Sequence, residues 1–584
     1  MTTKSLNSSK QQSKLSRVLP VLSWLPSYDR TWLIADIIAG LTLWGLVVPE
    51  GMAYAGVAGL PPQFGLYTLV ASLLVYALFG TSRHLSVGAT SATAALLAST
   101  VIAMGASTTD MTTYSAYAVA LVLVVGVVFL VAGLARLGWV TQFLSKPVMD
   151  GFVTGLAFFV AVGQLNKLFG VEKGEGNVFE KFFYVIKQLP EANWVTFAVG
   201  ASALALLFLL PRWNKKIPAG LVVLFASIII SVVFKLNANF GVEVAGVLPQ
   251  GLPSVSLPKV PLSTWVEMIL PAIGIFLVAY SEALGVAREF AEKHHYEVDP
   301  NQELNAHAIT NLASGLFGGM IAAGSMSCSA VKEGAGGRTQ ITNLVAWVVT
   351  LVTLLFLTPL FTDLPEAVLA ALIIHAIWHI IAARKLEKIR LVSRTEFGLA
   401  VITLLGVLFI DVLQGMIIGL LASLALIVYR SSRPHIASLG HVPGIPGAYS
   451  DLNRHPENIR IPGTLVLRLD APMYYANALT IRECIKTMIA DSQPPPHAIV
   501  LDAAGQDSLD ITGADMLKGL IVELKDEGID IYMAEVHATV REFGERMELL
   551  EIIGEDHIFP TVDTAVRFIE SSDRSDQANL DGSR

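Results

Sequence analysis

The chain has few charged residues and almost no cysteine. Of its 584 residues, 15% are charged, 53% are hydrophobic and two are cysteine. A soluble domain carries about a quarter charged residues, so an ordinary soluble enzyme is disfavoured. Two cysteines can form at most one disulfide, which cannot cross-link a secreted scaffold of this length, so a disulfide-rich fold is excluded. The sequence also shows no catalytic constellation, and we therefore expect neither an enzyme nor a metal-binding protein.

The charges that are present divide the chain into two regions. Residues 1–439 contain 28 Lys and Arg against 23 Asp and Glu, a balance of +5. Residues 440–584 contain 12 against 25, a balance of −13. The net charge of −8 therefore joins a long, slightly basic, apolar region to a short acidic one.

The long region consists of apolar stretches of the length that crosses a bilayer, about 20 residues. We count fourteen, centred on 33–57, 63–80, 86–105, 115–135, 148–165, 194–211, 217–236, 265–287, 303–323, 327–340, 341–361, 365–383, 396–411 and 412–430. The third and tenth are rich in Gly, Ser and Thr and are poor as full spans. Residues 1–30 are polar and do not read as a signal peptide, so we expect a cytoplasmic N-terminal segment before a transmembrane domain of residues 31–432.

The basic residues test this count independently, because cytoplasmic loops collect Lys and Arg. They follow the even-numbered spans, at Arg83, Arg136, Arg212, Arg288, Lys332, Arg384 and Arg430. Of the loops after odd-numbered spans, those near 106–113 and 362–366 have none, whereas the long loop 166–193 is mixed, with four lysines offset by four glutamates. An even number of spans with both termini in the cytoplasm is predicted.

The acidic region has the pattern of a small α/β domain. A Pro/Gly-rich linker, 433–460, precedes strand-like runs at 464–469, 498–501 and 529–533 and amphipathic helical stretches at 477–489, 513–527, 538–550 and 562–570. Alternating strands and helices predict a layered domain over residues 461–572, followed by a disordered tail, 573–584. This domain lacks a phosphate loop, a metal spacing and a nucleophile elbow, which indicates a binding or regulatory module.

Two acidic residues fall at membrane depth. Glu50 follows Pro49, which breaks the helix ladder in the first span, and Glu282 lies in the eighth span. An intramembrane carboxyl is costly and tends to mark a functional site, and its protonation can change when water or a cation reaches it. A snorkelling or structurally bonded acid is the alternative at each position; proton coupling is the functional interpretation.

Two further stretches, 83–93 and 318–340, each read as an extended segment that turns into a short helix. Their turns contain small residues and hydroxyls, which alone could reflect close helix packing. In transporters, broken helices direct their N-terminal N–H groups at an anion. One such start in each half of the span count predicts an inverted repeat with the site between the two.

Several long segments resemble one transporter family. PEGMAYAGVAGLPPQFGLYT (49–68), GTSRHLSVG (80–88), EVDPNQELNAHAITNLASGLFGG (297–319) and GSMSCSAVKEGAGGRTQ (324–340) resemble characteristic segments of the SulP family of anion transporters (solute carrier family 26). Residues 499–513 resemble the strand–loop–helix turn of its C-terminal STAS domain. The resemblance covers almost the whole chain. It implies an α-helical polytopic membrane protein, a 7+7 inverted-repeat transporter of 14 spans, plus a cytoplasmic STAS domain.

The resemblance also implies a site between the N-termini of the third and tenth spans. By motif, the substrate-binding residues are Glu50, Tyr54, Gly88, Ala89, Thr90, Ser91, Ser327 and Cys328. Glu50 and Glu282 are the expected proton-coupling residues. Many family members have Arg where Cys328 stands, and losing that fixed charge favours symport over free exchange. Val286 stands where sodium-dependent members have Thr, which makes Na+ a less favoured coupling ion than H+.

The expected function is secondary active transport of a small inorganic anion, sulfate, by proton symport with an elevator-type mechanism. Bicarbonate or C4-dicarboxylate transport, and anion exchange or a channel, remain alternatives. A nucleobase permease shares the fold but would have a carboxylate at the tenth span and no tail domain. A membrane-tethered sensor with vestigial transport is the fourth hypothesis.

The expected partners follow from this function. They are the anion and the lipid bilayer, with a homodimer and a regulatory protein at the STAS domain, and no nucleic acid. No cofactor is expected. The location implied is the bacterial inner membrane.

Overall fold

The computed structural model describes residues 19–582 except 175, 214–218, 253–254 and 379–382. The chain divides into two compact units, Met1–Ser423 and Leu424–Arg584. The predicted N-terminal segment, 1–30, lies outside the described residues up to residue 18. From residue 19 it forms α2 (Val21–Trp24) and the short 3-10 helices η1 (Leu25–Ser27) and η2 (Arg30–Trp32).

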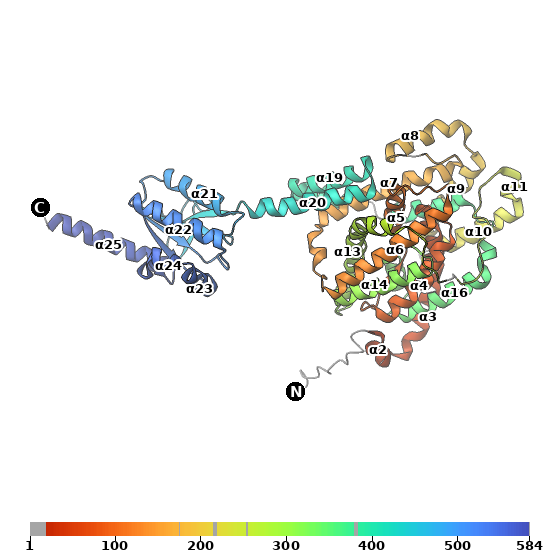
Figure 1. Ribbon diagram of the computed structural model, residues 1–584, viewed down its shortest axis with the longest axis horizontal. Coiled ribbons are helices and arrows are strands. Elements are labelled where there is room, and N and C mark those ends of the chain that lie inside the picture. The colour runs from red at the N-terminus through yellow and green to blue at the C-terminus, as the bar shows by residue number, and fades with distance from the viewer. Residues whose placement is uncertain (1–18, 175, 214–218, 253–254, 379–382, 583–584) are drawn as a thin grey trace. The chain divides into compact units, whose positions relative to one another are not determined.

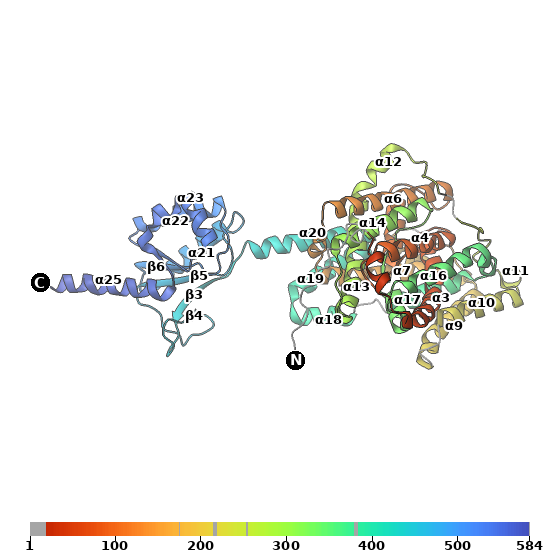
Figure 2. The same ribbon diagram turned by 90° about the horizontal axis from the view of Figure 1, so that it is seen from below.

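Helices overlap all fourteen predicted spans (Figures 1 and 2). In the first half they are α3 (Leu33–Val57), α4 (Gln63–Phe79), α5 (Ser91–Ala103), α6 (Met111–Leu134), α7 (Lys146–Phe169), α9 (Trp194–Trp213) and α10 (Ala219–Phe234). In the second half they are α13 (Ile269–Lys293), α14 (Pro300–Leu316), α15 (Met326–Gly334), α16 (Ile341–Val352), α17 (Glu366–Trp378), α19 (Arg394–Phe409) and α20 (Val412–Ser431). Short helices in the connections are η3 (Val140–Phe143), α8 (Val178–Gln188), η4 (Leu189–Glu191), α11 (Leu236–Phe240), α12 (Leu262–Glu267) and α18 (Ala383–Val392).

Seven helices among the described residues are long and apolar enough to cross a membrane by themselves. One of these continues from α16 through a π-helical turn, η5 (Thr353–Leu357), and a 3-10 turn, η6 (Thr358–Phe361). The other seven helices are shorter, and those of the third and tenth spans are short as the sequence predicts. These two helices, α5 and α15, have only 13 and 9 residues, because an extended segment precedes each.

The contacts between helices repeat across the two halves. α6 packs against α14, and α4, its neighbour two positions earlier in the same half, packs against α16. When the spans are numbered within each half, both pairs join a second span to a fourth span, and the two halves have exchanged places. α7–α19 and α9–α17 form a second exchanged pair, and α3–α16 and α6–α13 a third. The predicted 7+7 inverted repeat is confirmed, and it explains why α6 and α14 run side by side in Figure 1.

These contacts also separate the helices into two groups. Helices α3–α6 and α13–α16 pack on one another and form what we call the site group. Helices α7, α9, α10, α17 and α19 pack mainly on one another and form the flanking group. The groups meet where α3 contacts α10 and α17, and where α5 contacts α7.

Two three-residue strands pair side by side within the site group, at the place that we call the crossing. β1 (Ser86–Gly88) precedes α5, and β2 (Ala323–Ser325) precedes α15. The strands are antiparallel, with Ser86 opposite Ser325 and Gly88 opposite Ala323. All six residues are buried. Their pairing supplies partners for backbone groups that would otherwise be unsatisfied at membrane depth.

The second unit contains a six-stranded sheet in the order β4-β3-β5-β6-β7-β8. Its elements after α20 are β3 (Ile436–His441), β4 (Tyr449–Asp451), β5 (Thr464–Leu469), α21 (Ala478–Ala490), β6 (Ala498–Asp502), α22 (Ile511–Asp526), β7 (Asp530–Ala534), α23 (Ala538–Arg546), α24 (Leu549–Ile553), η7 (Glu555–His557), β8 (Ile558–Phe559) and α25 (Val562–Gly582). Strands β5 to β8 are parallel, as the predicted alternation of strands and helices requires.

Residues of the central strands alternate between the two faces of this sheet. Leu467, Ile499 and Ile531 pack with α21 and α22 on one face. Val466 and Val500 pack with α25 on the other. The small domain therefore has a three-layer core, which is what its short, continuously apolar strands predict.

Two of the predicted boundaries in this region differ from the structure. The segment 433–460, predicted as a linker, contains β3 and β4, because β3 pairs antiparallel with β5 and extends the sheet. The Pro/Gly residues between β3 and β4 form the turn of a hairpin. The tail 573–584, predicted as disordered, continues α25 to Gly582, since no proline or earlier glycine interrupts that helix. Residues 583–584 lie outside the described residues.

Candidate functional site

Each crossing strand leads into a capped helix start. The side chain of Thr90 accepts a hydrogen bond from the Thr93 N–H, and the Thr93 hydroxyl in turn accepts from the Thr90 N–H. Ser325 caps α15 by accepting from the Cys328 N–H at 3.3 Å. These caps fix both helix starts at the crossing of β1 and β2. The positive ends of two helix dipoles therefore lie at membrane depth, where they favour an anion.

Glu50 lies against the start of α15. It is 7% exposed and sits in α3 directly after Pro49. The Cys328 thiol donates to Glu50 Oε2 over 3.4 Å between sulfur and oxygen. Both residues line a small cavity together with Gly88 and Ala89 of the β1–α5 turn. The structure thus brings together four of the predicted site residues from three separate stretches of sequence.

Glu282 lies against the start of the other half-helix. It comes from α13 and is half-buried. The hydroxyl of Thr90 donates to Glu282 Oε2 at 3.4 Å. Each predicted coupling acid therefore contacts the start of one half-helix. Glu282 contacts the cap of α5, and Glu50 contacts the first turn of α15. The two acids occupy matching positions, which is what an inverted repeat predicts.

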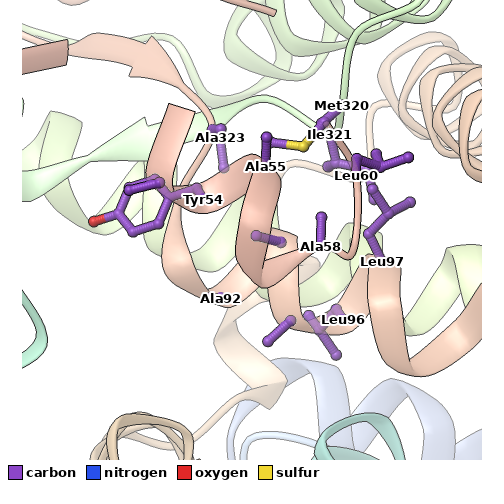
Figure 3. Close-up of a cluster of buried hydrophobic side chains, with 14 of the residues drawn as sticks. Tyr54, Ala55, Ala58, Leu60, Ala92, Leu96, Leu97, Met320, Ile321 and Ala323 are labelled. Atoms are coloured by element: carbon purple, nitrogen blue, oxygen red, sulfur yellow. The ribbon is translucent and has the colours of Figure 1, made fainter. Parts of the chain in front are cut away.

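The remaining predicted residues surround this crossing with different roles. Tyr54 is buried one turn after Glu50 in α3. Figure 3 shows its ring at the edge of a cluster of apolar side chains from α3, α5 and residues 320–323, with its hydroxyl directed away from them. Ser91 is buried at the first position of α5. Ser327 is exposed and its hydroxyl lies 3.1 Å from that of Ser325.

Sequence reasoning missed two buried acids near the N-terminal ends of α3 and α14. Glu303 of α14 is 1% exposed and accepts from the Tyr76 hydroxyl at 2.8 Å, from the Thr81 N–H and hydroxyl at 2.7 and 2.6 Å, and from the Ser82 N–H at 3.3 Å. Glu303 therefore holds the turn between α4 and β1. In the sequence, Glu303 lies in a weakly apolar stretch that contains several asparagines, and this pattern indicates a helix end.

The second missed acid, Asp36 of α3, does the same for the start of α16. It is fully buried and accepts from the N–H groups of Arg338 and Thr339. The hydroxyls of Thr339 and Thr342 also donate to it, at 2.7 and 3.0 Å. Asp36 is a carboxylate at a helix N-terminus supplied by a residue more than 300 positions away. Such a long-range cap leaves no local pattern.

A third missed residue is a buried base. Lys332 of α15 is fully buried, and its Nζ donates to the Arg83 carbonyl at 3.0 Å. In the sequence it was read as a cytoplasmic loop charge after the tenth span. The structure instead places it inside the site group, one helical turn beyond Cys328.

The described residues contain no group of three or more His, Cys, Asp or Glu side chains arranged to hold a metal ion. What the crossing offers is hydroxyls, helix N–H groups and two carboxyls. This donor set suits an oxyanion and a proton.

Comparison with known proteins agrees with this geometry. A sequence model of the sulfate permease family matches residues 33–403, and a model of the STAS domain matches residues 455–565. A probable sulfate transporter of Mycobacterium tuberculosis (strain H37Rv) is 36% identical over 540 residues, which is 92% of this chain and 96% of that protein. A probable sulfate transporter of Arabidopsis thaliana, 3.4, is 30% identical over 577 residues, covering 96% of this chain and 88% of that one.

Solved structures share the fold. The structure of SLC26A9 superposes with a TM-score of 0.88 at 24% identity, covering 97% of this chain and 94% of that one. The transmembrane domain of the cyanobacterial bicarbonate transporter BicA gives a TM-score of 0.59 at 23% identity, over 68% of this chain and 98% of that domain. At these identities the likeness concerns the fold alone.

Proposed function

The chain belongs to the sulfate permease family, and from this premise we propose that it carries sulfate into the cell together with protons. It is a multi-pass membrane protein that transports anions and is not an enzyme. Relatives at 36% and 30% identity are described as probable sulfate transporters. Sulfate is accordingly the proposed substrate.

One observation carries the proton part of the proposal. Glu50 and Glu282 each accept a single hydrogen bond of 3.4 Å. The donor to Glu50 is the Cys328 thiol in the first turn of α15, and the donor to Glu282 is the hydroxyl of Thr90, which caps α5. Neither forms an ion pair within 4.0 Å among the described residues. A carboxyl at membrane depth with so little compensation is favoured in its neutral form until water or a cation reaches it. Both acids can therefore load a proton next to the anion.

The anion itself would bind between the starts of α5 and α15. The caps Thr90 and Ser325 hold the two dipoles in place. Protonation of Glu50 and Glu282 removes two negative charges that would repel a divalent anion. Anion binding and proton binding then favour one another, which is the linkage that symport requires.

We further propose that the site group moves against the flanking group as an elevator. All the predicted site residues lie on α3, α5, α13, α15 and the crossing strands, which belong to one packed group. Such a body can carry its site across the membrane without breaking the β1–β2 pair. A hydrogen bond of 2.6 Å from Ser99 of α5 to Asp411, next to α20, is one contact that would exchange during the movement.

The location and assembly follow the same proposal. The basic loops favour cytoplasmic termini and a bacterial inner membrane. The STAS domain would serve for dimer contact and for binding a regulatory protein.

Uptake of radiolabelled sulfate by proteoliposomes tests the proposal. We expect an inward proton gradient to increase the initial rate, and Glu50→Gln and Glu282→Gln each to remove that increase. Glu289→Gln is the matched control, because Glu289 is exposed on the same helix as Glu282. Gradient-independent uptake that neither site variant changes would rule out symport.

A competition series tests the substrate. Unlabelled sulfate, bicarbonate, nitrate and succinate are each added to the same uptake assay. We expect sulfate to compete best. Stronger competition by bicarbonate or succinate would assign the protein to one of those substrates, while retaining the proton dependence.

A further inference from the structure

The buried base Lys332 stands out because no acid pairs with it. Its side chain is fully buried, and among the described residues no carboxylate oxygen lies within 4.0 Å of its Nζ. Asp36, the buried acid at the start of α16, is occupied by N–H and hydroxyl donors and forms no ion pair with Lys332. A buried, unpaired charge inside a membrane domain is costly and marks an ion pathway more often than a structural position.

The position of Lys332 relates it to the anion site. It follows Cys328 by four residues in α15, so the two side chains lie on the same face of the helix, about 6 Å apart along the axis. The Cα–Cβ bonds of a helix tilt toward its N-terminus, and here the N-terminus is the anion side. The Arg83 carbonyl that Lys332 contacts lies three residues before Ser86, which begins β1. Lys332 therefore adjoins both elements that form the site.

The site itself contains no basic side chain. The cavity between α3 and the half-helices is lined by Glu50 and by small, apolar and hydroxyl residues, among them Ala89, Ser325 and Cys328. Helix dipoles each contribute about half a charge, so the two helix starts together supply about one positive charge against the two negative charges of sulfate. A divalent anion needs a larger positive potential than the dipoles supply.

We propose that Lys332 carries a positive charge when the anion is bound, and that this charge makes the site selective for divalent over monovalent anions. This inference rests on the proposed function of the site. Lys332 acts through space and does not replace the N–H and hydroxyl donors at the helix starts. In the low-dielectric interior its field reaches the site with little screening.

A structural role alone would predict something different. Lys332 also ties down the turn between α4 and β1 by bonding to the Arg83 carbonyl. That turn has other ties: Gln340 donates to the Ser82 and Leu85 carbonyls at 2.7 and 2.9 Å, and Asn343 donates to the Leu85 carbonyl at 3.0 Å. Loss of one tie would weaken binding of all anions by the same factor.

The charge of the anion separates the two roles. The interaction energy of a fixed charge with an anion is proportional to the anion's charge. When Lys332→Gln removes it, the fold-increase in Kd for sulfate should be the square of that for nitrate, on the order of a hundredfold against tenfold. The probes are sulfate and nitrate, each titrated by calorimetry or displacement into purified full-length protein at constant ionic strength.

Three variants serve as controls. Lys332→Arg retains the charge and should leave both Kd values within about threefold of wild type. Lys293→Gln removes one charge at the exposed end of α13, where Lys293 pairs with Glu333 at 2.8 Å, and should change neither. Lys332→Met also removes the charge but places no polar group there, and it retains the length and apolar packing of the lysine stem. The same titrations are repeated with this variant.

The outcomes are decisive in both directions. Equal fold-increases for sulfate and nitrate would overturn the proposal, and so would the failure of both neutral variants to fold while Lys332→Arg folds. Nitrate that binds wild type as tightly as sulfate does would also contradict selectivity by charge. Wild-type protein that binds neither anion would refute the proposed function instead, so the two failures are distinguishable.

Discussion

Two regions of the membrane unit each contain a pair of acids, and the two pairs differ in the number of hydrogen bonds that they accept. Near the N-terminal ends of α14 and α3, Glu303 and Asp36 each accept at least four hydrogen bonds from N–H and hydroxyl groups. At the strand crossing, Glu50 and Glu282 each accept one long hydrogen bond.

The number of donors distinguishes a structural acid from a functional one. A carboxylate that accepts several N–H bonds is stabilised in its charged form and cannot leave without stranding its donors. An acid with one weak donor loses little when it changes its protonation state. Glu50 is buried like Glu303 and Asp36, so for this acid only the hydrogen-bond partners reveal the difference.

The largest effect expected from this comparison is on folding. Glu303→Ala leaves four buried donors without an acceptor, each costing about 1–3 kcal/mol. We expect this variant to be lost from the monodisperse peak in size-exclusion chromatography of detergent-solubilised protein. Glu50→Ala strands only the Cys328 thiol and should elute and melt like wild type. Equal melting temperatures for the two variants would break the comparison.

A smaller effect is expected where the crossing is held against α13. A Cβ on Gly324 of β2 would lie 2.8 Å from the Ala283 Cα, next to Glu282. Gly324→Ala must therefore shift the strand or the helix, at a cost of about 1–3 kcal/mol. We expect sulfate uptake to fall by about tenfold while the protein still folds.

The control for this prediction is Gly285→Ala in the same helix, because a Cβ there meets nothing within 4 Å. It should leave uptake unchanged. Normal uptake by Gly324→Ala would show that Glu282 tolerates displacement and is not held in register with Thr90.

The smallest effect is expected in the acidic domain, where a partly exposed acid pairs with two bases. Glu523 of α22 bonds to Lys486 and, at 2.6 Å, to Arg482 of α21. The hydrogen bonds from Lys486 and Arg482 lower the pKa of Glu523. Because the folded-state pKa lies below the unfolded value of about 4.3, this pair stabilises the domain at higher pH. The stabilisation is lost as the pH falls through the folded-state pKa.

Hydrogen exchange of the full-length protein measures this contribution. At pH 7, Glu523→Gln should speed exchange of the α21 and α22 amides by no more than about fivefold, because exposed ion pairs are screened. Raising the salt concentration should reduce the difference between variant and wild type. A loss of protection as large as that of Glu303→Ala would contradict the distinction between exposed and buried acids.

The elements of the site could be predicted because their signals are local. Pro49 beside Glu50 marks a break in a span, and hydroxyls with small residues at 88–91 and 325–328 mark the two helix starts. Apolar length and the spacing of basic residues gave the fourteen segments over which helices form. Each of these patterns is contained within one stretch of chain.

The misread segments have signals that are not local. Residues 433–460 read as a linker because Pro and Gly dominate them, yet β3 is a strand only by pairing with β5. Lys332 read as a loop charge, since nothing nearby in the sequence shows that its amine contacts the carbonyl of Arg83.

By itself, the sequence determined that this protein is a membrane transporter with an acidic α/β domain, because hydropathy, charge distribution and helix starts are properties of contiguous residues. It also named the four residues, Glu50, Thr90, Glu282 and Cys328, that meet at the crossing. Only the tertiary structure decided which acids accept several hydrogen bonds and which accept one. That distinction depends on donors contributed by residues hundreds of positions away, and their number is set by the packing of one repeat against the other.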